Sequence, residues 1–267
     1  MSDVAAVPRT EDAWRHAWLG AAMVAFGTSA RSTIAMCTSM SAMGGMSMPG
    51  GWTMPMTWMR MPGQTWPGAA ASFVGMWTVM MIAMMLPSLV PMLWRYRRAI
   101  GAHGARLEAL TALAAAGYFL VWAIGGFAVF TLGSVLGSVE MRYSTLARTV
   151  PIAVGVTVMV AGAMQLTAWK ARVLACCRGS LGPRRLSDDA GTAWRHGLRL
   201  GTHCTRCCFN LMLILAILGL MDLVMMTAVT AIMTAERIPG GDRVARVAGA
   251  FIVAVGLVMI ARAVRLA

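Results

Sequence analysis

Long stretches without charge constrain this chain more than any other feature of its sequence. No charged residue occurs in 109–139, 68–94 or 149–169, which are 31, 27 and 21 residues long. The 29 residues of 207–235 contain a single charge, Asp222. About 20 consecutive apolar residues cross a bilayer as a helix, whereas a transmembrane β-barrel shows short alternating segments. We therefore predict an all-α, polytopic transmembrane helical bundle.

The apolar runs predict about six spans. The predicted spans are residues 17–36, 70–94, 111–136, 149–169, 207–235 and 244–260. The first is the weakest because Arg31 lies inside it. As one helix the fifth would be about 43 Å long at about 1.5 Å per residue, whereas the hydrocarbon core measures about 30 Å. A strong tilt, or a break near Gly219–Asp222 that would give seven elements, resolves this mismatch.

Basic residues concentrate in two of the expected loops. The formal net charge is +13, with four arginines in 95–110 and eight lysines or arginines in 170–206. Basic residues beside membrane spans are typical of cytoplasmic loops. This distribution therefore explains the positive charge without nucleic acid, and we exclude nucleic-acid binding.

The same charges predict the orientation. We expect a cytoplasmic segment at 1–16 followed by a membrane domain at 17–264. Both termini and the basic, cysteine-flanked loop 170–206 are then cytoplasmic, and the loop 37–69 is external. If 207–235 formed two full spans, the C-terminus would lie outside instead.

The external loop is rich in methionine: nine of the 26 residues in MCTSMSAMGGMSMPGGWTMPMTWMRM, residues 36 to 61. The stretch shows neither a helical nor a strand period. Thioether sulfur is a soft, uncharged ligand that selects Cu(I) and needs no deprotonation. Methionine also fills apolar gaps or serves as an oxidation sink, but a dense cluster in a loop is not expected to fill a core. The candidate Cu(I) ligands are Met40, Met43, Met46, Met48, Met54, Met56, Met59 and Met61.

Methionines continue into the second span. Met76, Met80 and Met84 are four residues apart and therefore share one helix face. Met81 and Met85 form a neighbouring row. Such a ladder can pass a soft ion inward without charged groups, although packing is the simpler explanation for any single methionine. We predict that Met76, Met80 and Met84 bind the ion in transit.

Five of the six cysteines bracket the loop 170–206. Disulfides rarely persist in the cytoplasm, so we expect thiols, and thiols at C-x-x-C spacing indicate metal or redox chemistry. If the two flanking spans are neighbours, these groups meet, and they suit Cu(I) or Zn(II). The candidate ligands are Cys176, Cys177, His203, Cys204, Cys207 and Cys208.

Two acidic residues lie in or beside the fifth run. Asp222 is an ionisable residue inside a span and is therefore a functional candidate. Glu236 adjoins Arg237 at the end of the run, where a surface ion pair is the simpler expectation.

Several stretches together resemble the DUF2182 family of bacterial integral membrane proteins, which are described as predicted metal-binding. The resemblance covers roughly residues 52–260. The stretches are WMRMPGQTW, MWTVMMIAMMLPSLVPML, QLTAWKARVLACCR and HCTRCCFNLMLILAILGLMDLVMMTAVTAIMTAER. The family's cysteine pattern falls on Cys177 with Arg178 and on Cys204, Cys207 and Cys208.

The chain departs from this family at three positions. Val173 stands where the family has a cysteine, with Cys176 nearby, Phe209 stands where a tryptophan is common, and Asp222 replaces a usual asparagine. The resemblance implies metal binding in a bacterial inner membrane and no established activity.

We favour a Cu(I) capture, transfer or transport protein over an enzyme. Copper would pass between the external methionines and the inner thiols, to or from a copper chaperone or a membrane copper enzyme. One alternative is a membrane thiol oxidoreductase using Cys204 and Cys207. The other is a scaffold subunit with a structural zinc site.

Overall fold

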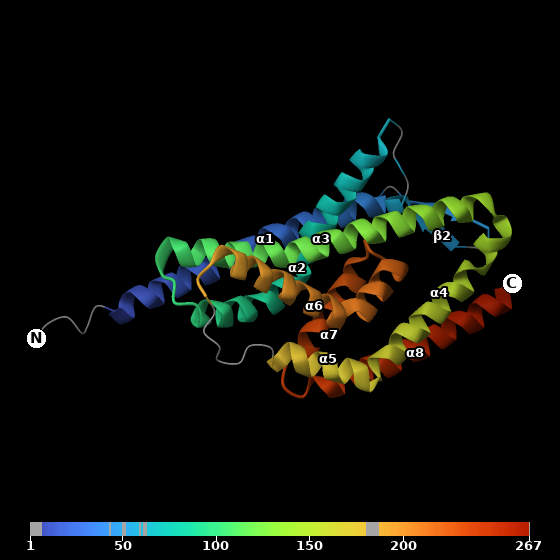
Figure 1. Ribbon diagram of the computed structural model, residues 1–267. Helices are drawn as coiled ribbons and strands as arrows, with labels where there is room; N and C mark the ends of the chain where they lie inside the picture. The colour runs from blue at the N-terminus through green and yellow to red at the C-terminus, as the bar shows by residue number, and fades with distance from the viewer. Residues whose placement is uncertain are drawn as a thin grey trace, which may run out of the picture.

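The computed structural model describes residues 7–42, 44–49, 52–58, 60, 63–179 and 187–266. These residues form long packed helices and one small hairpin (Figure 1), which confirms the all-α prediction. The helices are α1 (Val7–Ala42), α2 (Trp66–Ala99), α3 (Gly104–Arg142), α4 (Ser144–Gln165), α5 (Ala168–Gly179), α6 (Ala190–Leu218), α7 (Leu223–Glu236) and α8 (Gly241–Leu266). Strands β1 (Gly45–Met48) and β2 (Trp52–Pro55) precede a 3-10 turn, η1 (Met56–Trp58).

Five of the described helices are long and apolar enough to cross a membrane, namely α2, α3, α4, α6 and α8. They identify a membrane-embedded protein. The predicted first span lies in α1, a 36-residue helix that is not among the five. Its apolar part contains Arg31 and several hydroxyl residues, which lower its hydropathy.

The long run 207–235 divides into two helices, which confirms the predicted break near Gly219–Asp222 rather than one strongly tilted helix. Helix α6 ends at Leu218, and Asp222 caps the start of α7. The Asp222 carboxylate accepts hydrogen bonds from the backbone N–H groups of Val224 and Met225, at 2.8 and 3.0 Å. Asp222 therefore has a structural task, because an N-cap satisfies backbone donors that the helix leaves unpaired.

Helix α8 follows α7 and runs antiparallel to α4, since Gly249 approaches Gly162 and Gly256 approaches Met159. The first residues of α1 and the last residues of α8 lie at opposite ends of the bundle (Figure 1). The orientation of the termini stays a prediction, as does the alternative with the C-terminus outside. The second element of the divided run, α7, has 14 residues.

The expected loop 170–206 is largely helical. Helix α5 continues to Gly179 and α6 begins at Ala190, where the Asp189 side chain accepts a hydrogen bond from Thr192 N at 3.0 Å. Residues 180–186 lie outside the described part of the chain. Basic residues are as common in a polar helix as in an irregular loop, and the cytoplasmic location of this segment stays a prediction.

The methionine-rich segment is also more ordered than its pattern indicated. Helix α1 extends to Ala42, and β1 pairs with β2 so that Met46 opposes Met54 and Met48 opposes Trp52. These four side chains share one face of the hairpin, because strand residues alternate between faces. Met48 and Met54 are buried, and Trp52 Nε1 donates to the Ala147 carbonyl at 2.9 Å. Hairpin methionines therefore do fill a small core against α4, contrary to the expectation for a loop.

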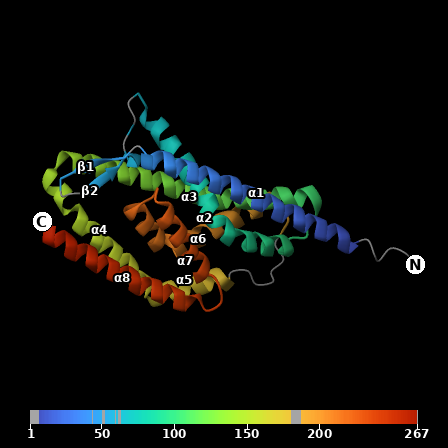
Figure 2. The same cartoon turned by 180° about the vertical axis from the view of Figure 1, so that it is seen from behind.

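Glycines let α4 and α8 pack in direct contact, side by side in Figures 1 and 2. A Cβ on Gly162 would lie 2.8 Å from the backbone nitrogen of Val253, and one on Gly256 would lie 2.7 Å from that of Met159. Real Cβ atoms do not approach backbone this closely. Small residues at such positions are a common basis of helix association in membranes.

We predict that Gly162→Leu destabilises the protein by about 1–3 kcal/mol, because the added side chain must push α8 away from α4. Thermal unfolding of the purified protein in detergent measures the effect. Gly125→Leu on α3 is the matched control, since no atom lies within 4 Å of a Cβ there. Equal melting temperatures for the two variants would contradict the close packing of α4 and α8.

Candidate metal centre

Helix α6 holds three buried cysteines in the interior of the bundle. Cys204, Cys207 and Cys208 are each 1–2% exposed. The Cys204 sulfur accepts a hydrogen bond from the Tyr118 hydroxyl of α3 at 3.0 Å. It also lies 3.9 Å from the Met85 sulfur of α2. The α6 thiols thus join the methionine-bearing helix α2 through one sulfur–sulfur contact.

Helix α5 brings the other two predicted cysteines to the same place. The Cys177 thiol contacts the His203 carbonyl at 3.7 Å, and the exposed Cys176 sulfur lies 4.0 Å from His203 Nδ1. A hydrogen bond with Cys207 lowers the pKa of the Cys177 thiol, against the effect of burial, and the positive charge of Arg237 adds to the lowering. The two cysteine groups therefore meet, as their flanking positions predicted, and none of the six cysteines forms a disulfide.

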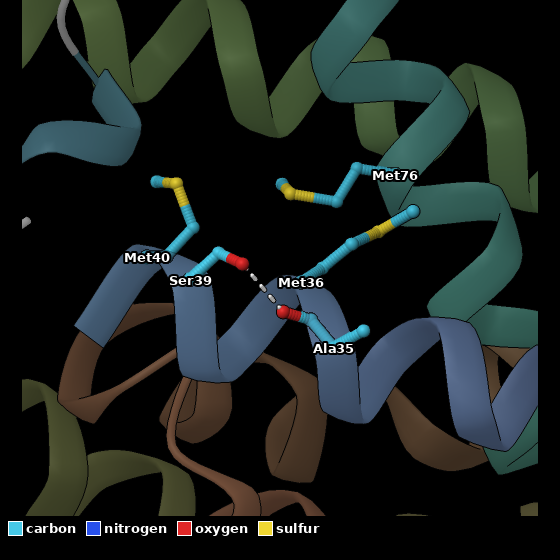
Figure 3. Close-up of a pocket in the computed structure, with 5 residues that line it drawn as sticks. All are labelled: Ala35, Met36, Ser39, Met40 and Met76. Carbon is cyan, nitrogen blue, oxygen red and sulfur yellow. Dashed lines mark hydrogen bonds between the residues drawn. The ribbon is translucent and has the colours of Figure 1, made fainter. Parts of the chain in front are cut away.

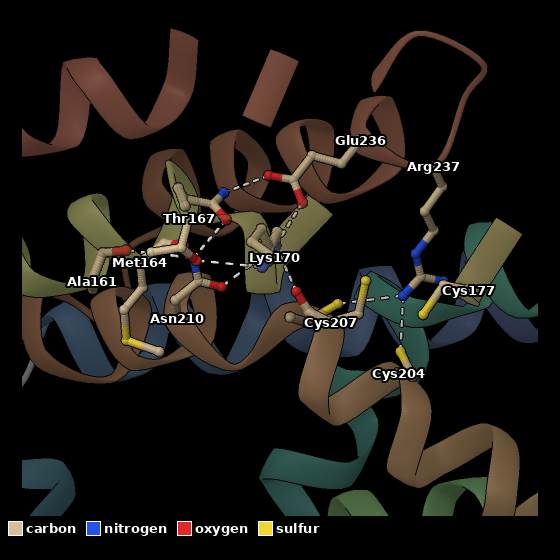
Figure 4. Close-up of polar contacts among 12 residues, drawn as sticks. Ala161, Met164, Thr167, Lys170, Cys177, Cys204, Cys207, Asn210, Glu236 and Arg237 are labelled. Carbon is tan, nitrogen blue, oxygen red and sulfur yellow. Dashed lines mark hydrogen bonds and ion pairs between the residues drawn. The ribbon is translucent and has the colours of Figure 1, made fainter. Parts of the chain in front are cut away.

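Arg237 brings a positive charge to the buried thiols. Its Nη2 donates to the Cys204 sulfur at 2.9 Å and to the Cys208 sulfur at 3.3 Å (Figure 4). The two cysteines are four residues apart on α6 and so share one face. The Arg237 Nε and Nη1 atoms are buried without a hydrogen-bond partner among the described residues. One guanidinium therefore bridges two sulfurs and keeps further donors beside them.

A buried ion pair supports the thiol cluster from the other side. Lys170 Nζ lies 2.9 Å from Glu236 Oε2, and these side chains are only 1% and 2% exposed. Lys170 Nζ also donates to the Cys207 carbonyl at 2.6 Å. The expected surface pair of Glu236 with Arg237 was wrong, because the end of α7 turns Glu236 toward α5 and Arg237 toward the sulfurs (Figure 4).

Two amides complete this polar network. Gln165 donates to the Glu236 carboxylate, and Asn210 Nδ2 donates to Gln165 Oε1 at 2.6 Å. All four side chains are buried. Their mutual hydrogen bonds offset the cost of placing charges away from water. The network fixes α4, α5, α6 and α7 around the cysteines, and we call it the Lys170–Glu236 network.

The methionines of the second span lie inside the bundle. Met80, Met81, Met84 and Met85 are all buried, while Met76 is half-buried. The predicted row of Met76, Met80 and Met84 is not the row that reaches the thiols. Met85, in the neighbouring row, makes that contact.

The predicted loop ligands are dispersed. Met46 is exposed, Met48 and Met54 pack in the hairpin core, and Met40 ends up in α1. Met43, Met59 and Met61 lie outside the described residues, and the side chain of Met56 is not described. The methionines that can be placed therefore lie in different settings: Met48 and Met54 in the hairpin core, and Met40 at a pocket between α1 and α2.

Within the described ranges, no group of three or more His, Cys, Asp or Glu residues is arranged as a ready metal site. The thiols instead hydrogen-bond to Arg237, Tyr118 and one another. A soft ion would replace these hydrogen bonds with bonds to sulfur. Thiol and thioether donors suit Cu(I) better than a hard cation.

Three contributors to the site escaped the sequence reasoning. Tyr118 carries no sequence signal, since its role depends on the close contact of α3 with α6. Arg237 was assigned to the surface because its neighbour is acidic. Met85 was noted in the second span, but its i, i+4 relation to Met81 did not distinguish its row from the other.

Comparison with known proteins gives one family. The model of the family described as PpoB2, copper chaperone, matches residues 74–259. The match includes Met76, the whole thiol cluster and most of α8, and it agrees with the resemblance to DUF2182. No curated protein and no solved structure matches the chain.

We predict that Lys170→Met destabilises the protein by about 3–5 kcal/mol, because it leaves Glu236 buried without its counter-charge. Chemical unfolding in detergent micelles gives the free energy. The control is Arg106→Met, which breaks an exposed pair with Asp188 and should cost no more than about 1 kcal/mol. A loss for Lys170→Met as small as the control's would show that the buried pair adds no stability.

Proposed function

The chain belongs to the PpoB2 copper chaperone family, and from this premise we propose that it carries Cu(I) in a membrane on the buried thiols of α6. The observation that supports this most directly is the group of sulfurs around Cys204. Its thiol lies within contact distance of the Met85 thioether and shares the Arg237 guanidinium with Cys208. Thiolate and thioether together are the ligands that select Cu(I).

Charge balance favours a monovalent ion at this place. Binding of one Cu(I) by the Cys204 and Cys208 thiols releases two protons and leaves a complex with a net charge of −1. Arg237 carries +1 and already lies against both sulfurs. The sum is zero, which matters because an uncompensated charge away from water is costly. A divalent ion on the same two thiolates would leave the guanidinium charge unbalanced.

The arrangement also favours a transferable ion over a permanent one. Structural zinc sites use four fixed protein ligands. Here Arg237 can return to the two sulfurs when the ion leaves, so the empty cluster retains hydrogen-bond partners. Methionine is a flexible ligand with three rotatable bonds, which suits it to receiving and releasing the ion at Met85.

The positions of the sulfurs suggest a route. Copper would pass between the hairpin end of the bundle and the thiols along the α2 methionines, including Met76, Met80 and Met84. We place the basic end in the cytoplasm of a bacterial inner membrane and the hairpin end outside, following the positive-inside effect. The exposed Cys176, beside His203, lies where a copper-carrying protein or a membrane copper enzyme could exchange the ion.

The first test replaces the two bridged thiols. We predict that Cys204→Ala with Cys208→Ala lowers the number of Cu(I) ions bound by the purified, reduced protein by one. Competition with a chromophoric Cu(I) chelator gives the count. Cys176→Ala is the control and should leave this ion in place, because Cys176 is exposed and outside the bridged pair.

Two outcomes would contradict the proposal. One is an unchanged Cu(I) count in the double variant. The other is a protein that holds one Zn(II) tightly and binds no Cu(I), which would favour the structural zinc site. A redox-active Cys204–Cys207 disulfide in the active protein would instead favour the thiol oxidoreductase.

The second test removes the balancing charge. We predict that Arg237→Leu weakens Cu(I) affinity about tenfold or more, in line with the value of a hydrogen bond to a charged group, whereas Arg237→Lys keeps part of it. The same chelator competition measures the change. Arg243→Leu, at an exposed position of α8, is the matched control. Equal affinities for Arg237→Leu and Arg243→Leu would refute the charge argument.

A further inference from the structure

Sulfur side chains also gather at a second place, between α1 and α2. An open pocket of ≈370 Å³ is lined by Met36, Met40 and Met76 together with Ala35 and Ser39. Figure 3 shows the three thioethers on facing sides of the same space, two from α1 and one from α2. All three methionines are half-buried, so part of each residue remains accessible from the surface.

The helical spacing explains the convergence. Met36 and Met40 are four residues apart in α1, and Met76 and Met80 are four apart in α2, so each pair lies along one face. The two helices pack against each other. Their methionine faces meet at the pocket, where no lining residue is charged.

A smaller pocket continues from the first into the protein. It shares Met36 and Met76 and adds Cys37, Met80 and Met221. Cys37 is 2% exposed, and its thiol donates to the Met226 sulfur of α7 at 3.8 Å. The Cys37 thiol therefore lies next to Met36 and Met76, on the side of the pocket that faces the interior of the protein.

We propose that Met36, Met40 and Met76 form a second Cu(I) site, the entry pocket, from which the ion passes to the Met80 thioether. The identity of the metal rests on the proposed function, whereas the position of the site rests on the pocket and its sulfurs. The three thioethers bind Cu(I) without releasing a proton or exchanging an electron. This pocket lies between helices, so it is a site distinct from the hairpin methionines of the same segment.

The entry pocket lies within reach of the α6 thiols. Met80 and Met85 are five residues apart in α2, which is about 7.5 Å along the helix axis. The intervening Met81 and Met84 are both buried in the same core. An ion can therefore move from thioether to thioether along α2 and arrive at Cys204 through Met85.

Gap filling by methionine is the competing explanation, and substitution by leucine distinguishes the two. Met36→Leu with Met76→Leu preserves volume and apolarity and should cost less than about 1.5 kcal/mol per site. We expect this double variant to bind one Cu(I) fewer than the wild-type protein, measured by competition with a Cu(I) chelator. Met23→Leu with Met92→Leu is the control, because it changes one methionine in α1 and one in α2 that line neither pocket.

A second background separates this proposal from the first. In the Cys204→Ala, Cys208→Ala protein, the remaining Cu(I) should show thioether-rich sulfur coordination by X-ray absorption, and adding Met36→Leu and Met76→Leu should remove it. If the Cys204→Ala, Cys208→Ala protein binds as many Cu(I) ions as the wild-type protein, the proposed function itself is overturned. An unchanged count after the methionine substitutions overturns the entry pocket alone. So does loss of all Cu(I) from the Met36→Leu, Met76→Leu protein, which would indicate one shared site.

Discussion

The buried pair of Lys170 and Glu236 is the interaction on which the arrangement of the interior depends. It joins α5 to the end of α7, reaches α4 through Gln165, and holds α6 through the Cys207 carbonyl. Two charges this deep are tolerable only because each is paired and hydrogen-bonded. With Glu236 held against Lys170 at the end of α7, the next residue, Arg237, extends to the sulfurs.

This coupling links the fold to the chemistry. Arg237 lies beside the thiols because the preceding residue, Glu236, is held against Lys170. The thiols also contact groups from two other helices, the Tyr118 hydroxyl of α3 and the Met85 sulfur of α2, both at Cys204. If the thiols bind copper as proposed, packing prepares the site before any ion is present. Sulfur would then supply the selectivity for a soft ion, and Arg237 would balance the negative charge.

The sequence predicted the parts of this protein that depend on composition along the chain. Uncharged runs identified the membrane helices, and the length of 207–235 anticipated the break that Gly219 and Asp222 make. The proximity of the two cysteine groups also followed from their places beside neighbouring helices. What the sequence could not predict depends on side-chain direction. Nothing in the pattern distinguishes Glu236 buried against Lys170 from Glu236 at a surface, or the Met85 row from the Met84 row.

The length of α7 has a consequence of its own. Helix α6 runs about 10 residues beyond Cys208 before it ends, and α7 returns over 14 residues to place Arg237 beside Cys204 and Cys208. The length of α7 therefore determines where Glu236 and Arg237 lie. One residue inserted or deleted within α7 would turn its end by about 100° and shift it by about 1.5 Å, which would carry both members of the Glu236–Arg237 pair away from their partners. A substitution at an exposed position of this helix, such as Val224, leaves both contacts in place, whereas a change in its length removes them.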